Sequence, residues 1–218
     1  MIRKQPFTIR SLVFVVALGI VGILPLPAQD GGLYGGGAPD DAAYVRLIHG
    51  AEQTGTITTS IGDTEYGPLS FATVTPYRPV AAGLYPLRIS GRGGELVARD
   101  GAYFTIAVLS ERLAVFEDPE LTDPTQAQLF LYNVAGGTPL ELSAADGSTT
   151  VIGPVGAGEA EEVLVTPVEA EFAVRNDDQV VADLGDPGLE RGQSYSVIVL
   201  LSSTGPRVVV EQAEVDAE

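Results

Sequence analysis

The sequence has no cysteine among its 218 residues and only one histidine. Without cysteine, no disulfide can form, so the folded parts must be held together by burial of apolar side chains. Zinc sites use cysteine or clustered histidine, so a chain with no cysteine and one histidine is not expected to bind zinc in this way. A Ser-His-Asp mechanism would have to use His49 as its base.

Basic residues are also scarce: 12 Lys and Arg face 29 Asp and Glu, and the formal net charge is −17. The only lysine, Lys4, lies with Arg3 and Arg10 in a segment that we expect to be removed, so the mature chain is still more acidic. Such a surface repels nucleic acid, anionic lipid headgroups and polyanionic polysaccharides. We expect no nucleic-acid partner, and we interpret the acidity as an adaptation to salty surroundings.

Residues 1–28 have the pattern of a secretory signal peptide. The basic start is followed by an apolar run of 13 residues, Leu12 to Leu24, and by small residues at the expected cleavage point, Ala28. A membrane span needs about 20 apolar residues. We therefore expect export to the periplasm with no membrane insertion after cleavage; a retained anchor is the alternative.

A glycine-rich lead-in, residues 29–42, follows the signal segment and should be flexible. Leu33 and Tyr34 are apolar at a place where a linker needs no apolar residue. They either pack on the first folded domain or, together with Pro39, form a short docking motif. Leu33, Tyr34 and Pro39 are therefore the candidate partner-binding residues.

An internal repeat organises the rest of the chain. Ala43–His49 returns as Ala127–Asn133, and Gly101–Val108 returns near Gln193–Val199. Each unit thus opens and closes with an apolar, strand-like run. The repeat predicts two small domains of similar plan.

The fold class expected is all-β, with two tandem small immunoglobulin-like β-sandwiches. The chain has 26 glycines and 15 prolines, and no stretch of ten residues has a helical apolar period. The predicted parts are domain 1 at residues 43–118, an acidic proline-containing linker at 119–126, domain 2 at 127–211 and a frayed acidic tail at 212–218.

Short strands are expected throughout both domains. In domain 1 they are predicted at 43–49, 56–61, 69–74, 83–89, 96–98, 103–109 and 113–116. In domain 2 they are predicted at 129–134, 140–144, 149–152, 160–165, 169–174, 179–184, 195–201 and 207–210.

Several polar residues have structural explanations that compete with functional ones. A glycine shortly precedes both Tyr103 and Tyr195, which resembles the tyrosine corner of immunoglobulin-like domains and predicts a structural role. His49 is matched by Asn133 in the repeat, so a shared hydrogen bond at a turn explains it better than catalysis. The acidic runs at 176–178 and 183–186 suit polar turns better than calcium. We therefore predict no catalytic residue, no metal and no cofactor.

Short motifs along the chain resemble the AlgF family of alginate O-acetylation proteins. They occur in the family's order, and each is weak alone. They are Leu33-Tyr34-Gly35 with Ala38-Pro39, Tyr44-Val45-Arg46-Leu47, Ala144-Ala145-Asp146-Gly147, Val151-Ile152-Gly153-Pro154-Val155, Thr166-Pro167-Val168-Glu169 and Leu189-Glu190-Arg191-Gly192.

The resemblance implies a periplasmic, non-catalytic adaptor for O-acetylation of an exopolysaccharide, with alginate as the expected polymer. The implied partners are periplasmic SGNH-type acetyltransferases and a membrane-bound O-acyltransferase, with the polysaccharide as a further candidate. The mature chain departs from the family in lacking lysine, which weighs against cationic capture of alginate. A polysaccharide-binding module is the alternative function, and an acetylesterase or acetyltransferase is a third.

Overall fold

The computed structural model describes residues 41–177 and 179–216. All of these belong to one compact unit, Gly35–Glu218. The expected signal peptide and the candidate docking residues Leu33, Tyr34 and Pro39 lie outside the described residues. The described part is built of strands and one short 3-10 turn, Glu52–Thr54, which confirms the all-β class. The immunoglobulin-like type and the domain boundaries stay predictions.

Strands β1 to β8 form the first half of the fold, Ala42–Asp118, and strands β9 to β16 form the second half, Ala127–Gln212. The strands of the first half are β1 Ala42–His49, β2 Ile57–Ile61, β3 Thr64–Leu69, β4 Arg78–Ala81, β5 Gly83–Ile89, β6 Arg92–Ala98, β7 Tyr103–Val108 and β8 Leu113–Asp118. Those of the second half are β9 Ala127–Asn133, β10 Leu140–Ala144, β11 Thr150–Val155, β12 Ala160–Val165, β13 Phe172–Asn176, β14 Gln179–Gly185, β15 Ser194–Ser202 and β16 Gly205–Gln212.

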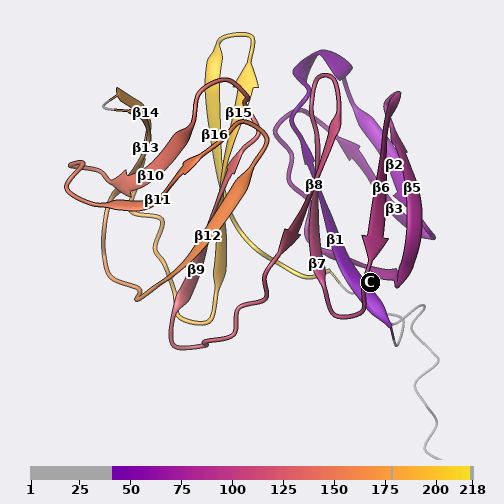
Figure 1. Cartoon of the computed structure of the whole chain (residues 1–218), viewed down its shortest axis with the longest axis horizontal. Helices are drawn as coiled ribbons and strands as arrows, with labels where there is room; N and C mark the ends of the chain where they lie inside the picture. Colours follow the sequence, from indigo (N-terminus) through magenta and orange to yellow (C-terminus); the bar gives the residue numbers. More distant parts are fainter. Residues whose placement is uncertain (1–40, 178, 217–218) are drawn as a thin grey trace, which may run out of the picture. The chain divides into compact units, whose positions relative to one another are not determined.

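The sequence repeat corresponds to a repeated four-stranded sheet (Figure 1). The strand order is β4-β1-β7-β8 in the first half and β12-β9-β15-β16 in the second. In both sheets the central pair is parallel and both outer strands are antiparallel to their neighbours. The hairpins β2-β3 and β5-β6 accompany the first sheet, and the sheet β11-β10-β13-β14 accompanies the second.

Alternation along β1 and β9 sends neighbouring side chains to opposite faces of each sheet, because the strand period is two residues. Val45 and Leu47 point into the core of the first half. Leu129 and Leu131 point into the core of the second half. A third apolar cluster joins the two halves by their outward-facing side chains; its buried members are Ile48, Ala107, Ala114, Phe130, Tyr132, Val134, Ile198 and Leu200.

One strand prediction for the first half is wrong, and two strands, β3 and β4, were missed. The segment predicted at 69–74 is not a strand, because the chain turns after Leu69 with Ala72 at a φ of 66°, and only Val74 makes an isolated bridge, to Ile48. The true strand is β3, whose glycine and proline obscured it. Strand β4 was missed because Pro79 argues against a strand; β4 is an edge strand of its sheet, where proline is tolerated.

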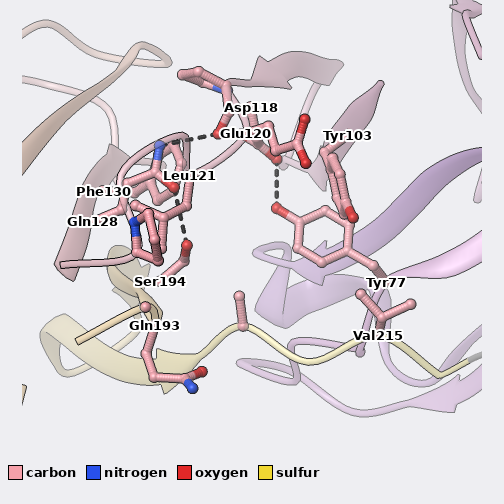
Figure 2. A pocket seen from close by; sticks show the side chains of 14 residues that line it. Tyr77, Tyr103, Asp118, Glu120, Leu121, Gln128, Phe130, Gln193, Ser194 and Val215 are labelled. Carbon is pink, nitrogen blue, oxygen red and sulfur yellow. Dashed lines mark hydrogen bonds between the residues drawn. The ribbon is translucent and has the colours of Figure 1, made fainter. Parts of the chain in front are cut away.

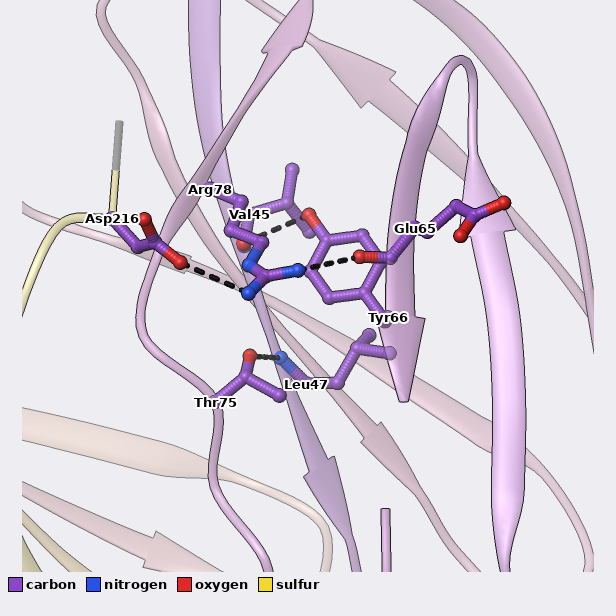
Figure 3. Close-up of polar contacts among 7 residues, drawn as sticks. All are labelled: Val45, Leu47, Glu65, Tyr66, Thr75, Arg78 and Asp216. Carbon is purple, nitrogen blue, oxygen red and sulfur yellow. Dashed lines mark hydrogen bonds and ion pairs between the residues drawn. The ribbon is translucent and has the colours of Figure 1, made fainter. Parts of the chain in front are cut away.

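The tail residues up to Asp216 are paired with both halves, so the expectation of a frayed tail is wrong for them. The tail segment, Ala213–Asp216, begins with the amide of Ala213 donating to Ser194 O in the second half. The Tyr77 amide of the first half donates to Glu214 O, and the Asp216 amide donates to Tyr77 O, each at 2.8 Å. Arg78 then pairs with Asp216 at 2.9 Å and donates to the carbonyl of Glu65 (Figure 3).

Candidate functional site

An arginine is buried where the two halves meet. Arg46 lies on β1 and is 1% exposed. Its Nε donates to Thr105 Oγ1, which lies opposite on β7, at 2.8 Å. Its Nη2 donates to Tyr132 Oη at 2.9 Å and to Ser196 Oγ at 2.8 Å, both in the second half. The guanidinium also stacks over the ring of Tyr77, 4.5 Å from its centroid. A single cation is thus held by groups from both halves.

The matching acid is Asp118, the last residue of β8, which is 5% exposed. Its carboxylate accepts hydrogen bonds from three hydroxyls: Tyr77 at 2.7 Å, Thr105 at 2.5 Å and Tyr132 at 2.5 Å. Burial raises the pKa of Asp118, and the charge of Arg46 and the three donors oppose that rise. Asp118 is the last residue of predicted domain 1, directly before the predicted linker, and its burial was not predicted.

We call these six residues the buried polar network: Arg46, Tyr77, Thr105, Asp118, Tyr132 and Ser196. Its hydroxyls either donate to Asp118 or accept from Arg46. Burial and the charge of Asp118 raise the pKa of Tyr132 well above its ordinary value, so this phenol stays neutral. The network contains no imidazole. Its chemistry is therefore that of a satisfied pair of buried charges that fixes the contact between the halves.

His49 is fully buried and both of its ring nitrogens are engaged. Nδ1 accepts from the Ala51 amide at 3.3 Å, which leaves Nε2 to donate to Gly55 O at 2.5 Å. Asn133 likewise donates to the carbonyls of Thr138 and Val155. The shared hydrogen-bonding role predicted from the repeat is confirmed, and no ring nitrogen is left to activate a nucleophile.

The two tyrosines singled out in the sequence have different surroundings. The Tyr195 hydroxyl accepts from the Glu190 amide at 3.0 Å and donates to Gly188 O at 3.3 Å, which closes the loop before β15. The Tyr103 ring instead stacks on Tyr44, with centroids 4.9 Å apart. The corner-like role of the pair stays a prediction, and Tyr103 lies at a cavity.

That cavity has a volume of about 300 Å³ and opens beside the buried polar network (Figure 2). Tyr77 and Tyr103 lie on one side of it, and Gln128, Leu121 and Ser194 lie on the other. The segment after β8 and the tail segment contribute as well. The cavity is therefore formed by both halves and by the segments that connect them.

Of the acidic runs weighed as calcium sites, Asp178 lies outside the described residues, and the carboxylates of the run at 183–186 accept from nearby backbone amides. Asp183 accepts from the Gly185 amide, and Asp186 accepts from the Gly188 amide. Across residues 41–177 and 179–216, no group of three or more His, Cys, Asp or Glu is placed to hold a metal. No helix in that same part is long and apolar enough to cross a bilayer.

Sequence reasoning did not single out the buried polar network, although one signal for it was present. Tyr44, Arg46 and Ile48 alternate with core residues on β1, and the apolar Tyr44 and Ile48 on that face indicate a strand covered on both faces. The equivalent face of β9 carries Phe130 and Tyr132. Two aromatic residues on the outward face of a repeated strand indicate a second contact surface. Nothing in the sequence indicated that Arg46 would meet them.

The fold and site define an all-β protein of two similar halves that, in the part described, pairs no nucleophile with a free base. The family described as "Alginate O-acetyl transferase AlgF" matches residues 15–196, and the chain belongs to this AlgF family. It is 28% identical over 192 residues to the alginate biosynthesis protein AlgF of Azotobacter vinelandii, covering 86% of this chain and 84% of the relative.

The corresponding protein of Pseudomonas putida is 24% identical over 191 residues, with 87% of each chain covered. Among solved structures, the C-terminal domain of AlgF from P. aeruginosa matches with 27% identity and a TM-score of 0.37, covering 40% of this chain and 98% of that domain.

Proposed function

We propose that this protein is a periplasmic, non-catalytic adaptor required for O-acetylation of an exopolysaccharide. Its role is to bridge SGNH-type acetyltransferases and a membrane-bound O-acyltransferase. The polymer proposed is alginate, because the AlgF relatives are named as alginate biosynthesis proteins. Export is proposed from the signal-like segment at residues 1–28.

One observation carries the non-catalytic part of the proposal: the only histidine of the chain is buried with both ring nitrogens engaged. Acyl transfer through a serine needs a base that can take the hydroxyl proton. Asp118 does not replace it, because its oxygens accept from three hydroxyls inside the buried polar network.

The contact between the halves supports a bridging role. An adaptor that binds two partners benefits from surfaces held at a fixed spacing, since less conformational freedom is then lost on binding. The buried polar network and the apolar cluster around Tyr132 hold the halves in this way. The acidic surface opposes direct binding of a polyuronate, which disfavours the polysaccharide-binding alternative.

A chromosomal deletion complemented with variants tests this proposal. The readout is the O-acetyl content of the secreted polymer. We expect deletion to abolish acetylation without abolishing the polymer, and His49→Asn, which copies the repeat residue Asn133, to restore at least half of the wild-type acetyl content. Purified protein should hydrolyse no chromogenic acetyl ester above the buffer rate. Turnover that His49→Asn removes would instead identify an enzyme.

The candidate docking residues Leu33, Tyr34 and Pro39 are a separate part of the proposal. Replacing Leu33 and Tyr34 with serine should reduce cross-linking to the acetyltransferases in living cells. Replacing Gln29 and Asp30 with alanine in the same lead-in is the control. Unchanged cross-linking by the serine variant would remove this segment from the docking surface.

A further inference from the structure

The cavity of Figure 2 has most of its polar groups already paired. Gln128 Nε2 donates to Pro119 O at 3.0 Å, and Gln128 Oε1 accepts from Ser194 Oγ at 2.9 Å. Gln193 Oε1 accepts from Gln212 Nε2 at 3.0 Å. Asp118 is saturated by its three hydroxyl donors. These groups line the cavity without being available to a ligand.

Of the two acids that line the cavity in the described part, Asp118 and Glu120, only Asp118 is engaged in this way. Glu120 is exposed, lines the cavity and belongs to neither ion pair found among the described residues, Arg78–Asp216 and Arg99–Glu117. It lies close enough to Tyr103 to act on it: burial, then Tyr44, then Glu120 raise the pKa of Tyr103. An available carboxylate therefore lies beside an aromatic ring.

The ring of Tyr103 stacks on Tyr44 and meets Tyr77 edge-on, with centroids 5.1 Å apart. The face of Tyr77 already receives Arg46 from inside the protein. Phe130 adds a third ring to the lining, and no lining residue in the described part is basic. Aromatic rings beside a carboxylate, with no internal cation on the cavity side, form the environment that favours a guanidinium or an ammonium.

We propose that this cavity binds the side chain of an arginine or lysine presented by a partner protein, between Tyr103 and the carboxylate of Glu120. The proposal rests on the proposed adaptor function. The occupant is chosen by charge complementarity, since the chain has 29 acidic residues against 12 basic ones. A volume of about 300 Å³ is at the low end for ligand pockets and suits one side chain.

Other ligands fit the cavity less well. A uronate sugar would bring its carboxylate against Glu120, which is unfavourable. A divalent cation needs several available oxygen ligands, and those of Asp118 accept hydroxyl hydrogens instead. Arginine is the preferred occupant over lysine, because its planar group can stack on a ring and still pair with a carboxylate.

The test is a titration of the full mature chain, followed by amide chemical shifts, with the peptide acetyl-Ala-Ala-Arg-Ala-Ala-amide. The matched peptide replaces arginine with citrulline, which has the same shape and no charge. We expect saturable shifts at Tyr103, Leu121 and Ser194 with the arginine peptide, and binding at least about threefold weaker with citrulline. Sodium chloride at high concentration should lower the affinity for the arginine peptide toward that for the citrulline peptide.

Two variants sharpen this test. Glu120→Gln should lower the affinity for the arginine peptide about threefold to fivefold, because it removes only the charge of an exposed group. Glu95→Gln makes the same change at an exposed position of β6 outside the cavity and should leave binding unchanged. Tyr103→Leu should also weaken binding, provided that thermal unfolding shows the variant to be folded.

Equal binding of the two peptides, equal binding by Glu120→Gln and wild type, or shifts at these amides with a mannuronate oligomer would overturn the inference. Failure here is distinguishable from failure of the adaptor function. If Glu120→Gln binds the peptide like wild type while deletion of the gene still abolishes acetylation, the adaptor function stands and only the cavity is misassigned.

Discussion

At the scale of single residues, the hydroxyl of Tyr132 connects the two buried charges. It accepts from Arg46 Nη2 and donates to Asp118 Oδ1. Tyr132→Phe would remove one acceptor of Arg46 and one donor to Asp118. We expect a loss of about 1–3 kcal/mol in the free energy of unfolding. Urea denaturation measures this loss.

Tyr85→Phe is the matched control for that change. The Tyr85 hydroxyl donates to Ala81 O at the surface, so its loss should cost less than about 0.5 kcal/mol. If both phenylalanine variants cost the same, the buried polar network contributes nothing beyond an ordinary surface hydrogen bond.

Asp118 predicts a pH dependence whose sign follows from its raised pKa. Between the ordinary pKa and the raised one, the folded state binds more protons than the unfolded state, so stability from this group falls as the pH rises. Relative to Asp118→Asn, the wild-type melting temperature should therefore decrease from pH 4 toward pH 7. If the melting temperature of the wild type instead rises relative to that of Asp118→Asn over this range, the pKa of Asp118 is lowered in the folded state.

The residue scale is also where sequence prediction was weakest. The roles of His49 and Asn133 followed from comparing the two repeats, because equivalent positions face equivalent turns. Arg46 and Asp118 could not be paired from the sequence, since their partners lie on other strands and in the other half. Only the register of the sheets and the packing of the halves bring them together.

At the scale of elements, β3 and β11 each contain a Gly-Pro pair at a matching position. Gly67 and Gly153 have φ values of 119° and 123°. A β-carbon would lie 2.6 Å from Ile57 O at Gly67 and 2.9 Å from Leu140 O at Gly153, where each strand passes its neighbour. The close approach therefore requires glycine in both halves.

Replacing either glycine with alanine should lower the free energy of unfolding by at least about 1 kcal/mol, because alanine is strained at positive φ and meets a backbone oxygen. Gly93→Ala on β6 is the control, since its nearest new contact would be Arg88 Nη1 at 3.8 Å. Melting temperatures of the three variants decide the point. A Gly67→Ala variant as stable as Gly93→Ala would contradict the described geometry.

The sequence predicted strands best where the apolar pattern was continuous. The core strands β1, β7, β9 and β15 were placed within about two residues of their observed ends, as is usual for element boundaries. The prediction failed at β3 and β4, which contain Pro68 and Pro79, and at 69–74, where apolar residues lie in and beside a turn. Propensity describes a residue, whereas a strand also needs a neighbour with which to pair.

At the scale of the whole molecule, the tail segment connects the second half back to the first. Ending the chain after Gln212 removes the hydrogen bonds to Tyr77 and the ion pair with Arg78. We expect a loss of about 1–3 kcal/mol in stability and faster hydrogen exchange at the Tyr77 amide.

Arg78→Gln separates the two contributions of the tail segment. This variant keeps the backbone hydrogen bonds and removes a half-buried ion pair, so it should cost about 1 kcal/mol. Unchanged exchange at Tyr77 in the truncated chain would show that the tail segment is not paired there in solution.

The two-fold repetition of the chain was evident in the sequence, but the way its parts meet was not. The tail was expected to be frayed, as chain ends usually are. Instead, the tail segment pairs through its backbone and through the Arg78–Asp216 ion pair. Asp118, at the end of the first half, is buried among hydroxyl partners.

The buried polar network also limits how this protein can be recombined. A chimaera that takes residues up to Asp118 from one homologue and the remainder from another would join Arg46 to whatever occupies positions 132 and 196 of the donor. Apolar residues there would leave the buried guanidinium of Arg46 without hydrogen-bond partners. The chimaera would then be unstable even if both parent proteins were stable. Exchange between relatives is therefore viable only when these positions travel together.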